Sequence, residues 1–120
     1  MSTKRLGNAG ERIAVEHLRA KGYTILHTNW RWGHKELDVV AQQGQTLVVV
    51  EVKTRQSDYW QEPHEAVRQR KQRHMVEAAD AYVGRLEADL DVRFDIISIV
   101  WNHGRYAVEH IEDAFGPTLR

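Results

Sequence analysis

Residues 36–54 read ELDVVAQQGQTLVVVEVKT, and this stretch sets the architecture that the rest of the chain has to fit. Two apolar runs flank a polar turn at Gln43-Gly44, which predicts antiparallel strands over about residues 34–42 and 45–53. The run Leu47–Val50 is apolar at every position, as in a strand that is covered on both faces of a sheet. We therefore expect a central strand with packed layers on both sides.

The rest of the chain supplies those layers. Apolar residues at helical spacing predict helices over about residues 8–21 and 63–86, and residues 54–63 are expected to form a polar loop. Further strands are expected over about residues 23–30, 93–101 and 105–111. The order α-β-β-β-α-β-β predicts an α/β fold in which helices flank a mixed sheet. Because the 120 residues contain no repeat or linker, we expect residues 1–120 to form a single domain.

Composition excludes several classes of protein. The chain has no cysteine, which rules out disulfides, thiolate catalysis and cysteine-based zinc sites. It has no apolar run of the roughly 20 residues that a membrane-spanning helix needs, and its N-terminus does not resemble a signal peptide. We therefore expect a cytoplasmic protein without a membrane partner. The net charge is zero, but residues 1–74 carry 13 basic and 8 acidic side chains and residues 75–120 carry 4 and 9, which leaves room for an anionic partner such as DNA.

Carboxylates gather at one end of the predicted hairpin. A two-residue turn at Gln43-Gly44 places Glu36 opposite Glu51, with Asp38 and Lys53 on the same face of the two strands. Opposed like charges destabilise a sheet, so we expect a compensating charge. Either a divalent cation held by carboxylate oxygens or an internal lysine would provide it.

The tripeptide Glu51-Val52-Lys53 has two interpretations. Acid-x-Lys is common in strands, and in most proteins it marks only a solvated edge. Here it follows four consecutive apolar strand residues, and the turn brings Asp38 to the same face, which favours a functional site. A bound Mg²⁺ there would lower the pKa of a water molecule and neutralise charge on a phosphate, with Lys53 stabilising the charge that develops.

A longer pattern carries a family resemblance. Its residues are Gly10-Glu11, Leu18, Gly22-Tyr23, Asn29-Trp30-Arg31, Glu36-Leu37-Asp38-Val39-Val40, Leu47 to Arg55, Glu65-Ala66-Val67, Lys71, Arg93-Phe94-Asp95 and Ala114-Phe115. Over about residues 8–115 the chain resembles the YraN family of uncharacterised bacterial proteins. That family is similar to archaeal Holliday-junction resolvases, in the PD-(D/E)XK nuclease superfamily.

The resemblance implies a restriction-endonuclease-like fold and a site for Mg²⁺ or Mn²⁺. It assigns Asp38, Glu51 and the Val52 carbonyl to the metal, Lys53 to catalysis, and Glu11 to the helix-one acid directed at the metal. Glu36 is a candidate accessory acid. The resemblance also implies hydrolysis of DNA, on branched or flapped substrates, and a homodimer. The alternative is a catalytically inactive nucleic-acid-binding or protein-interaction module of a DNA repair or uptake assembly.

Basic and aromatic residues are the candidates for contact with nucleic acid. The candidate cations are Arg55, Arg68, Arg70, Lys71 and Arg73. Lys71 falls on the otherwise apolar row of its helix, so we expect it to reach an acidic partner near the site or a phosphate. The arginines form either a solvated face or a grip on a phosphate backbone. Three tryptophans at predicted strand ends or in loops fit either core or rim packing, the commoner role for each, or stacking on unpaired bases: Trp30, Trp32 and Trp60.

Overall fold

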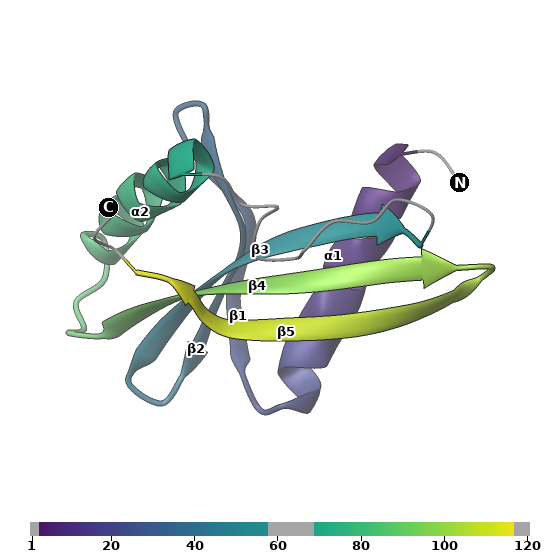
Figure 1. Cartoon of the computed structure of the whole chain (residues 1–120). Helices are drawn as coiled ribbons and strands as arrows, with labels where there is room; N and C mark the ends of the chain where they lie inside the picture. Colours follow the sequence, from purple (N-terminus) through teal and green to yellow (C-terminus); the bar gives the residue numbers. More distant parts are fainter. Residues whose placement is uncertain (1–2, 58–68, 117–120) are drawn as a thin grey trace.

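Five strands form one mixed sheet in the order β1-β2-β3-β4-β5, with a helix on each face. The computed structural model describes residues 3–57 and 69–116. Its elements are α1 (Thr3–Ala20), β1 (Thr24–Trp32), β2 (Lys35–Gln43), β3 (Thr46–Gln56), α2 (Gln69–Val83), β4 (Asp91–Asn102) and β5 (Arg105–Phe115). This confirms the expected α/β fold and element order. The two helices lie toward opposite ends of the sheet (Figure 1).

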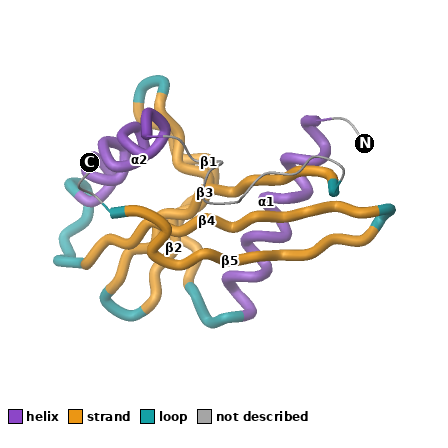
Figure 2. Tube along the Cα trace, in the orientation of Figure 1, coloured by secondary structure: helices purple, strands orange, loops and turns teal. Residues whose placement is uncertain are grey.

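Strand β3 is the centre of the sheet. It pairs antiparallel with β2 and parallel with β4, and α2 lies in the connection between β3 and β4. Leu47–Val50 are fully buried, as their apolar run predicts. Figure 2 shows the consequence in the trace, where β3 and β4 run side by side and β5 forms one edge of the sheet.

Alternate residues of β3 face two separate hydrophobic cores. Leu47 and Val49 pack with the buried face of α2, which includes Met75 and Tyr82. Val48 and Val50 pack with Ala14 and Leu18 of α1. Because successive strand residues point to opposite faces, each helix covers its own side of the sheet. Neither helix in the described ranges is long and apolar enough to cross a membrane.

The register of the β2–β3 hairpin differs from the predicted one. The turn is Gly44-Gln45, with Gln43 paired to Thr46, and so Glu36 does not lie opposite Glu51. Gly44 supplies the positive φ of 59° that the first turn position requires, while Gln45 needs none, as in a type II′ turn. The error moves each pair by two residues, so over the paired residues 39–43 and 46–50 the faces of both strands remain as predicted.

Two strands continue beyond their expected ends. β3 runs on to Gln56 because its polar end pairs with β4 as far as Trp101, so residues 54–56 are strand and not loop. β5 runs on to Phe115, which pairs with Phe94 and stacks on it with ring centroids 5.1 Å apart. The helix α1 begins at Thr3, earlier than predicted, and α2 ends at Val83. The expected loop and helix start over residues 58–68 lie outside the described residues.

Helix α1 approaches β3 most closely at Gly10. A Cβ atom at this position would overlap Thr54 Oγ1 and lie 3.2 Å from Thr54 Cβ and Cγ2. The missing side chain therefore lets the helix backbone rest against the end of β3. This contact fixes the height of the neighbouring residue, Glu11, over the sheet.

We expect Gly10→Ala to lower the free energy of unfolding by about 1–3 kcal/mol, because the added methyl group forces α1 away from β3. Thr54→Ala removes the overlapping hydroxyl and should restore most of the loss in the double variant. Urea unfolding of the wild type, both single variants and the double variant gives the coupling between the two sites. Purely additive effects would show that the two residues do not touch.

Candidate carboxylate site

Asp38 lies where β2 separates from β3. The last paired residues of the hairpin on this side are Val39 and Val50. Asp38 is the next residue of β2, and its Oδ2 accepts a hydrogen bond of 2.9 Å from the N–H of Val52, two residues beyond Val50 in β3. Since the N–H and C=O of one strand residue point to the same edge, the Val52 carbonyl faces the same gap. Asp38 and the backbone of Val52 therefore meet at the opening between the strands.

The strands β1 and β2 turn sharply at this point. Leu37 packs in the α2 core and Val39 in the α1 core, although alternate residues of a regular strand share one face. On the neighbouring strand, Asn29 has a left-handed backbone with φ of 51°. Asparagine tolerates this conformation better than most residues do. The local change of face explains why Asp38 is directed to the gap and not into either core.

Three carboxylates come together beside this gap. Among the described residues, one oxygen each of Glu11, Glu36 and Asp38 lie within 4.8 Å of one another. Asn29 Nδ2 donates to Glu11 Oε2 at 3.1 Å, and Arg31 Nη2 lies 3.3 Å from Glu36 Oε2. Each carboxylate thus has one neighbouring donor that orients it. The sequence identified all three acids but gave no reason for Glu11 and Glu36 to approach each other.

Glu51 occupies a more buried position next to Asp38. It is 5% exposed, and two lysines flank it. Lys53 Nζ lies 3.9 Å from Glu51 Oε1 and Lys71 Nζ lies 3.8 Å from Glu51 Oε2. Both distances are longer than a hydrogen bond, and Glu51 Oε2 has no hydrogen-bond partner. A buried, unpartnered carboxylate oxygen of this kind can accept another ligand.

Burial and repulsion from neighbouring carboxylates raise the pKa of both inner acids. For Glu51, burial and then the nearby Asp38 raise the pKa from 4.5 to about 8, although Lys71 and Lys53 oppose the shift. For Asp38, burial raises the pKa, while the Val52 hydrogen bond and Lys71 lower it in part. Pairs of carboxyls with raised pKa values are typical of functional sites.

The acids line one small cavity of about 300 Å³. Its lining residues are Leu6, Gly7, Glu11, Asp38, Glu51, Val52, Lys53 and Thr54. The structure therefore brings together the sequence-predicted residues Glu11, Asp38, Glu51 and Lys53, with Glu36 adjacent to Glu11 and Asp38.

The predicted basic residues divide between the site and the outer surface. Lys71 reaches Glu51, as its place on the apolar row predicts. Arg70 and Arg73 are exposed on α2, and Arg73 lies about 200° around the helix from Lys71. Arg55 follows Lys53 on β3 and is partly buried. Arg68 lies outside the described residues. Arg73 therefore faces away from the carboxylates, whereas Lys71 faces them.

The match to known proteins covers the whole of this site. Residues 10–99 match the model of the uncharacterised protein family UPF0102. The chain belongs to this family. A UPF0102 protein of Bacteroides thetaiotaomicron is 48% identical over 114 residues, covering 95% of this chain and 94% of the relative. One from Parabacteroides distasonis is 47% identical, covering 92% and 91%, and one from Porphyromonas gingivalis is 48% identical, covering 95% and 86%.

Membership of UPF0102 confirms the resemblance to the YraN family. The matched residues run from Gly10, at the contact of α1 with β3, to Ile99 of β4. They include Glu11, Asp38 and Glu51, and so the carboxylate site belongs to the part of the chain that defines the family.

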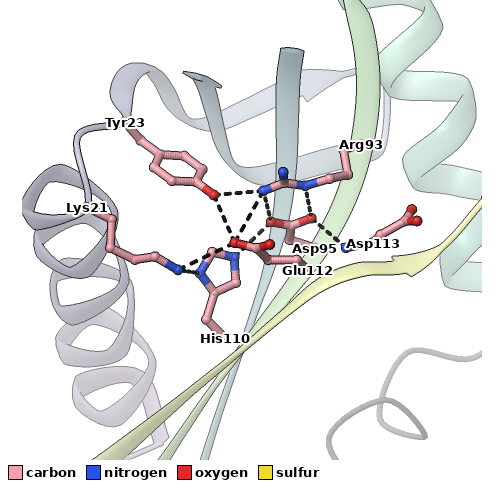
Figure 3. Close-up of polar contacts among 7 residues, drawn as sticks. All are labelled: Lys21, Tyr23, Arg93, Asp95, His110, Glu112 and Asp113. Carbon is pink, nitrogen blue, oxygen red and sulfur yellow. Dashed lines mark hydrogen bonds and ion pairs between the residues drawn. The ribbon is translucent and has the colours of Figure 1, made fainter. Parts of the chain in front are cut away.

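This UPF0102 chain also contains a buried polar network that the sequence did not predict. Asp95 is fully buried on β4, and Arg93 binds it through two hydrogen bonds of 2.9 and 2.8 Å (Figure 3). His110 Nε2 lies 2.8 Å from Asp95 Oδ2, and the Asp113 N–H donates to Asp95 Oδ1 at 3.0 Å. Arg93 also donates to the Tyr23 hydroxyl at 2.7 Å. The network joins β4, β5 and the segment after α1.

Burial alone would raise the pKa of Asp95, but hydrogen bonds from His110, Arg93 and Asp113 outweigh it and hold the pKa below its ordinary value. The motif Arg93-Phe94-Asp95 was visible in the sequence as part of the resemblance. Its alternation places Arg93 and Asp95 on one face, which is the signal that could have identified the pair. The partners from β5 are too distant in the chain to be inferred.

The raised pKa of Glu51 predicts a specific pH dependence of stability. The native state keeps the Glu51 proton up to about pH 8 and the unfolded chain releases it near pH 4.5, so unfolding becomes easier as pH rises through that window. In the presence of a chelator, Glu51→Gln should flatten the dependence by up to about 1.4 kcal/mol per pH unit. Thermal unfolding between pH 5 and 8 measures how stability changes with pH in the two proteins. The control is Glu109→Gln, at an exposed position on β5. Equal slopes for Glu51→Gln and wild type would contradict the assignment.

Asp95 predicts the opposite dependence on the acidic side. Because its native pKa is lowered, its contribution is complete above about pH 4 and is lost as pH falls through the native pKa. We expect Asp95→Asn to reduce the free energy of unfolding at pH 7 by about 2–4 kcal/mol, since Arg93 and His110 lose a buried carboxylate. The difference from wild type should shrink below pH 4. Asp91→Asn, at the exposed start of β4, is the matched control and should change stability by less than about 0.5 kcal/mol.

Proposed function

We propose that this protein is a metal-dependent nuclease that hydrolyses phosphodiester bonds in DNA. The observation that carries the proposal is the convergence of Glu11, Glu36 and Asp38 within 4.8 Å, directly beside the buried Glu51. Placing so many carboxylates together, two of them buried enough to raise their pKa values, is unfavourable in the absence of a cation. Such an arrangement is typical of a site that acts on an anionic substrate through a bound cation.

The donor set fits a hard divalent cation. Carboxylate and backbone carbonyl oxygens are the ligands that Mg²⁺ and Mn²⁺ prefer, and the site provides both types. Asp38, Glu51 and the Val52 carbonyl would hold the ion, with Glu11 and Glu36 at its outer side. Glu51 Oε2, which is buried without a hydrogen-bond partner, is an acceptor that such an ion would satisfy. The bound ion would supply Lewis acidity and a water molecule of lowered pKa.

Lys53 provides the cationic group at the mouth of the site. Its side chain is 38% exposed, and Nζ lies 3.9 Å from Glu51 Oε1. From there it can donate a hydrogen bond to an attacking water or to a non-bridging phosphate oxygen. A positioned ammonium group stabilises the negative charge that develops on phosphorus oxygens in the transition state. Lys71, on α2, lies 3.8 Å from the second oxygen of Glu51 and adds positive charge beside it.

The substrate class rests on the sequence pattern together with this geometry. Asp38 and the tripeptide Glu51-Val52-Lys53 sit on neighbouring strands at the point where those strands part. This is the arrangement that the resemblance to the PD-(D/E)XK nucleases and to Holliday-junction resolvases implies. We therefore propose DNA as the substrate, with branched or flapped forms as the first to be tested.

One observation favours a second candidate function. Lys53 and Lys71 together already balance the charge of Glu51, so the acids can be held by lysines in place of a metal. In that case the domain would bind nucleic acid or a protein partner without cleaving anything. The two candidates differ in whether Asp38 is required for function.

The proposal predicts metal-dependent cleavage. Purified wild type should cut at least one of single-stranded, duplex, flapped and four-way-junction DNA with Mg²⁺ or Mn²⁺ and none with EDTA. Asp38→Asn and Lys53→Met should each reduce the rate at least about 100-fold without unfolding the protein. Glu109→Gln, an exposed acid on β5, serves as the control.

Calorimetric titration with Mn²⁺ separates the role of Asp38, as a metal ligand, from that of Lys53. Asp38→Asn should lose the binding heat, because a ligand is gone, whereas Lys53→Met should keep it. If wild type cuts none of the four DNAs with either metal, hydrolysis is wrong. DNA binding that depends on salt but is indifferent to metal and to Asp38 would support the second candidate.

A further inference from the structure

The turn between β1 and β2 lies against the outer side of α2, and together they form a cationic surface with an exposed aromatic ring. We call this surface the turn-and-helix patch. Its residues are Trp32, His34 and Lys35 from the turn and Arg70, Arg73 and His74 from α2. The two segments touch through the rings of His34 and His74, whose centroids are 5.9 Å apart. Figures 1 and 2 show the turn beside the start of α2.

The charge of this patch is strongly positive for a protein with no net charge. Lys35, Arg70 and Arg73 carry permanent positive charges, and Glu77 binds Lys35. The pKa of His74 is lowered, mainly because the ring loses water and also because Lys35 and Arg70 repel the charged form. A concentration of cations of this kind favours contact with phosphates.

Trp32 gives the patch a stacking surface. The described residues expose two large hydrophobic side chains, Trp32 at 40% and Tyr106 at 51%. Tyr106 packs on Trp101 at the opposite end of the molecule, with ring centroids 5.2 Å apart, but Trp32 sits among cations, with Lys35 Nζ 5.1 Å from its ring centroid. An aromatic ring surrounded by Lys and Arg is typical of surfaces that bind unpaired bases.

The patch adjoins the carboxylate site along the chain. Trp32 follows Arg31, which is 74% exposed and pairs with Glu36 at 3.3 Å, and Lys35 precedes Glu36 directly. Glu36 in turn belongs to the group of three carboxylates. A strand held at the carboxylates can therefore continue over Arg31 onto the turn. Trp32 and Glu36 are only four positions apart in the chain.

We propose that the turn-and-helix patch binds the unpaired nucleotides of the nucleic-acid substrate, next to the phosphodiester bond at the carboxylates. Arg70 and Arg73 contact the phosphates, and Trp32 stacks on a base. A base inside a regular duplex is not available for stacking, so the patch selects substrates with single-stranded character. This inference rests on the proposed function for its biological meaning, but the binding it describes does not require cleavage.

The test measures binding in EDTA, so that cleavage plays no part. Fluorescence anisotropy compares single-stranded DNA, single-stranded RNA and duplex DNA of equal length. We expect single strands to bind more tightly than the duplex. Trp32→Ala should weaken single-strand binding by about 5- to 100-fold, with a change of less than two-fold for the duplex, and Trp32→Phe should retain most of the affinity. Comparison of single-stranded RNA with single-stranded DNA shows whether the sugar affects the affinity.

The cations are tested through salt dependence. The double variant Arg70→Gln/Arg73→Gln should bind all the nucleic acids more weakly and reduce the slope of log K against log salt by about 1.4 for single strands, since two phosphate contacts are lost. Tyr106→Ala and Arg105→Gln, at the far hairpin of β4 and β5, are matched controls and should bind within two-fold of wild type. Melting temperatures check that every variant is folded.

Two results would overturn the inference: Trp32→Ala binding single strands as wild type does, or equal losses for single strand and duplex. Displacement of the bound single strand by a polyglutamate peptide of equal total charge would also overturn it, because the patch would then recognise negative charge alone. Failure of the nuclease proposal has a different signature. A protein that binds single strands through Trp32 but never cleaves would contradict hydrolysis and leave the patch intact.

Discussion

Burial of β3 on both faces is the constraint on which the rest of the structure depends. Its apolar residues Leu47–Val50 separate two cores, one closed by α1 and the other by α2. Glu51 is the next residue. Its exposed fraction is only 5%, so this carboxyl group lies in the protein interior together with the apolar residues before it. A carboxyl group in that position needs a proton, a cation or both. Lys53 and Lys71 supply positive charge beside it, whereas the nearby Asp38 adds to the need for a proton or a cation.

The same constraint explains why the site draws on distant segments. Glu51 and Lys53 come from β3, Asp38 from the end of β2, Glu11 from α1 and Lys71 from α2. Packing contacts hold these segments in place, such as Gly10 of α1 against Thr54 at the edge of the cavity and Met75 of α2 in the α2 core. The acids are therefore kept close together by the packing of the fold and in spite of their mutual repulsion.

Sequence patterns predicted the elements and their faces because these depend on local periodicity. The alternation in β2 and β3 holds over the paired residues of the hairpin, and an error of one residue in the turn did not change that. It does not hold at Asp38, because β2 changes face between Leu37 and Val39. Contacts between segments far apart in the chain could not be predicted from the sequence pattern. The approach of Glu11 to Glu36 brings α1 together with β2, and partners of Asp95 come from β5. Neither leaves a periodic signal.

Helix α1 contacts the sheet near its middle and again just beyond its C-terminal end. Gly10 rests on Thr54 of β3, and just beyond the helix Lys21 Nζ lies 2.9 Å from His110 Nδ1 and 3.6 Å from Glu112 Oε1 on β5. A helix secured in this way has no free end in this stretch from which to fray, so its amides between these two points exchange hydrogen only when the sheet itself opens. Glu11, inside that stretch, belongs to the same cooperative unit as β3, and so its backbone keeps its place over the sheet for as long as the protein is folded.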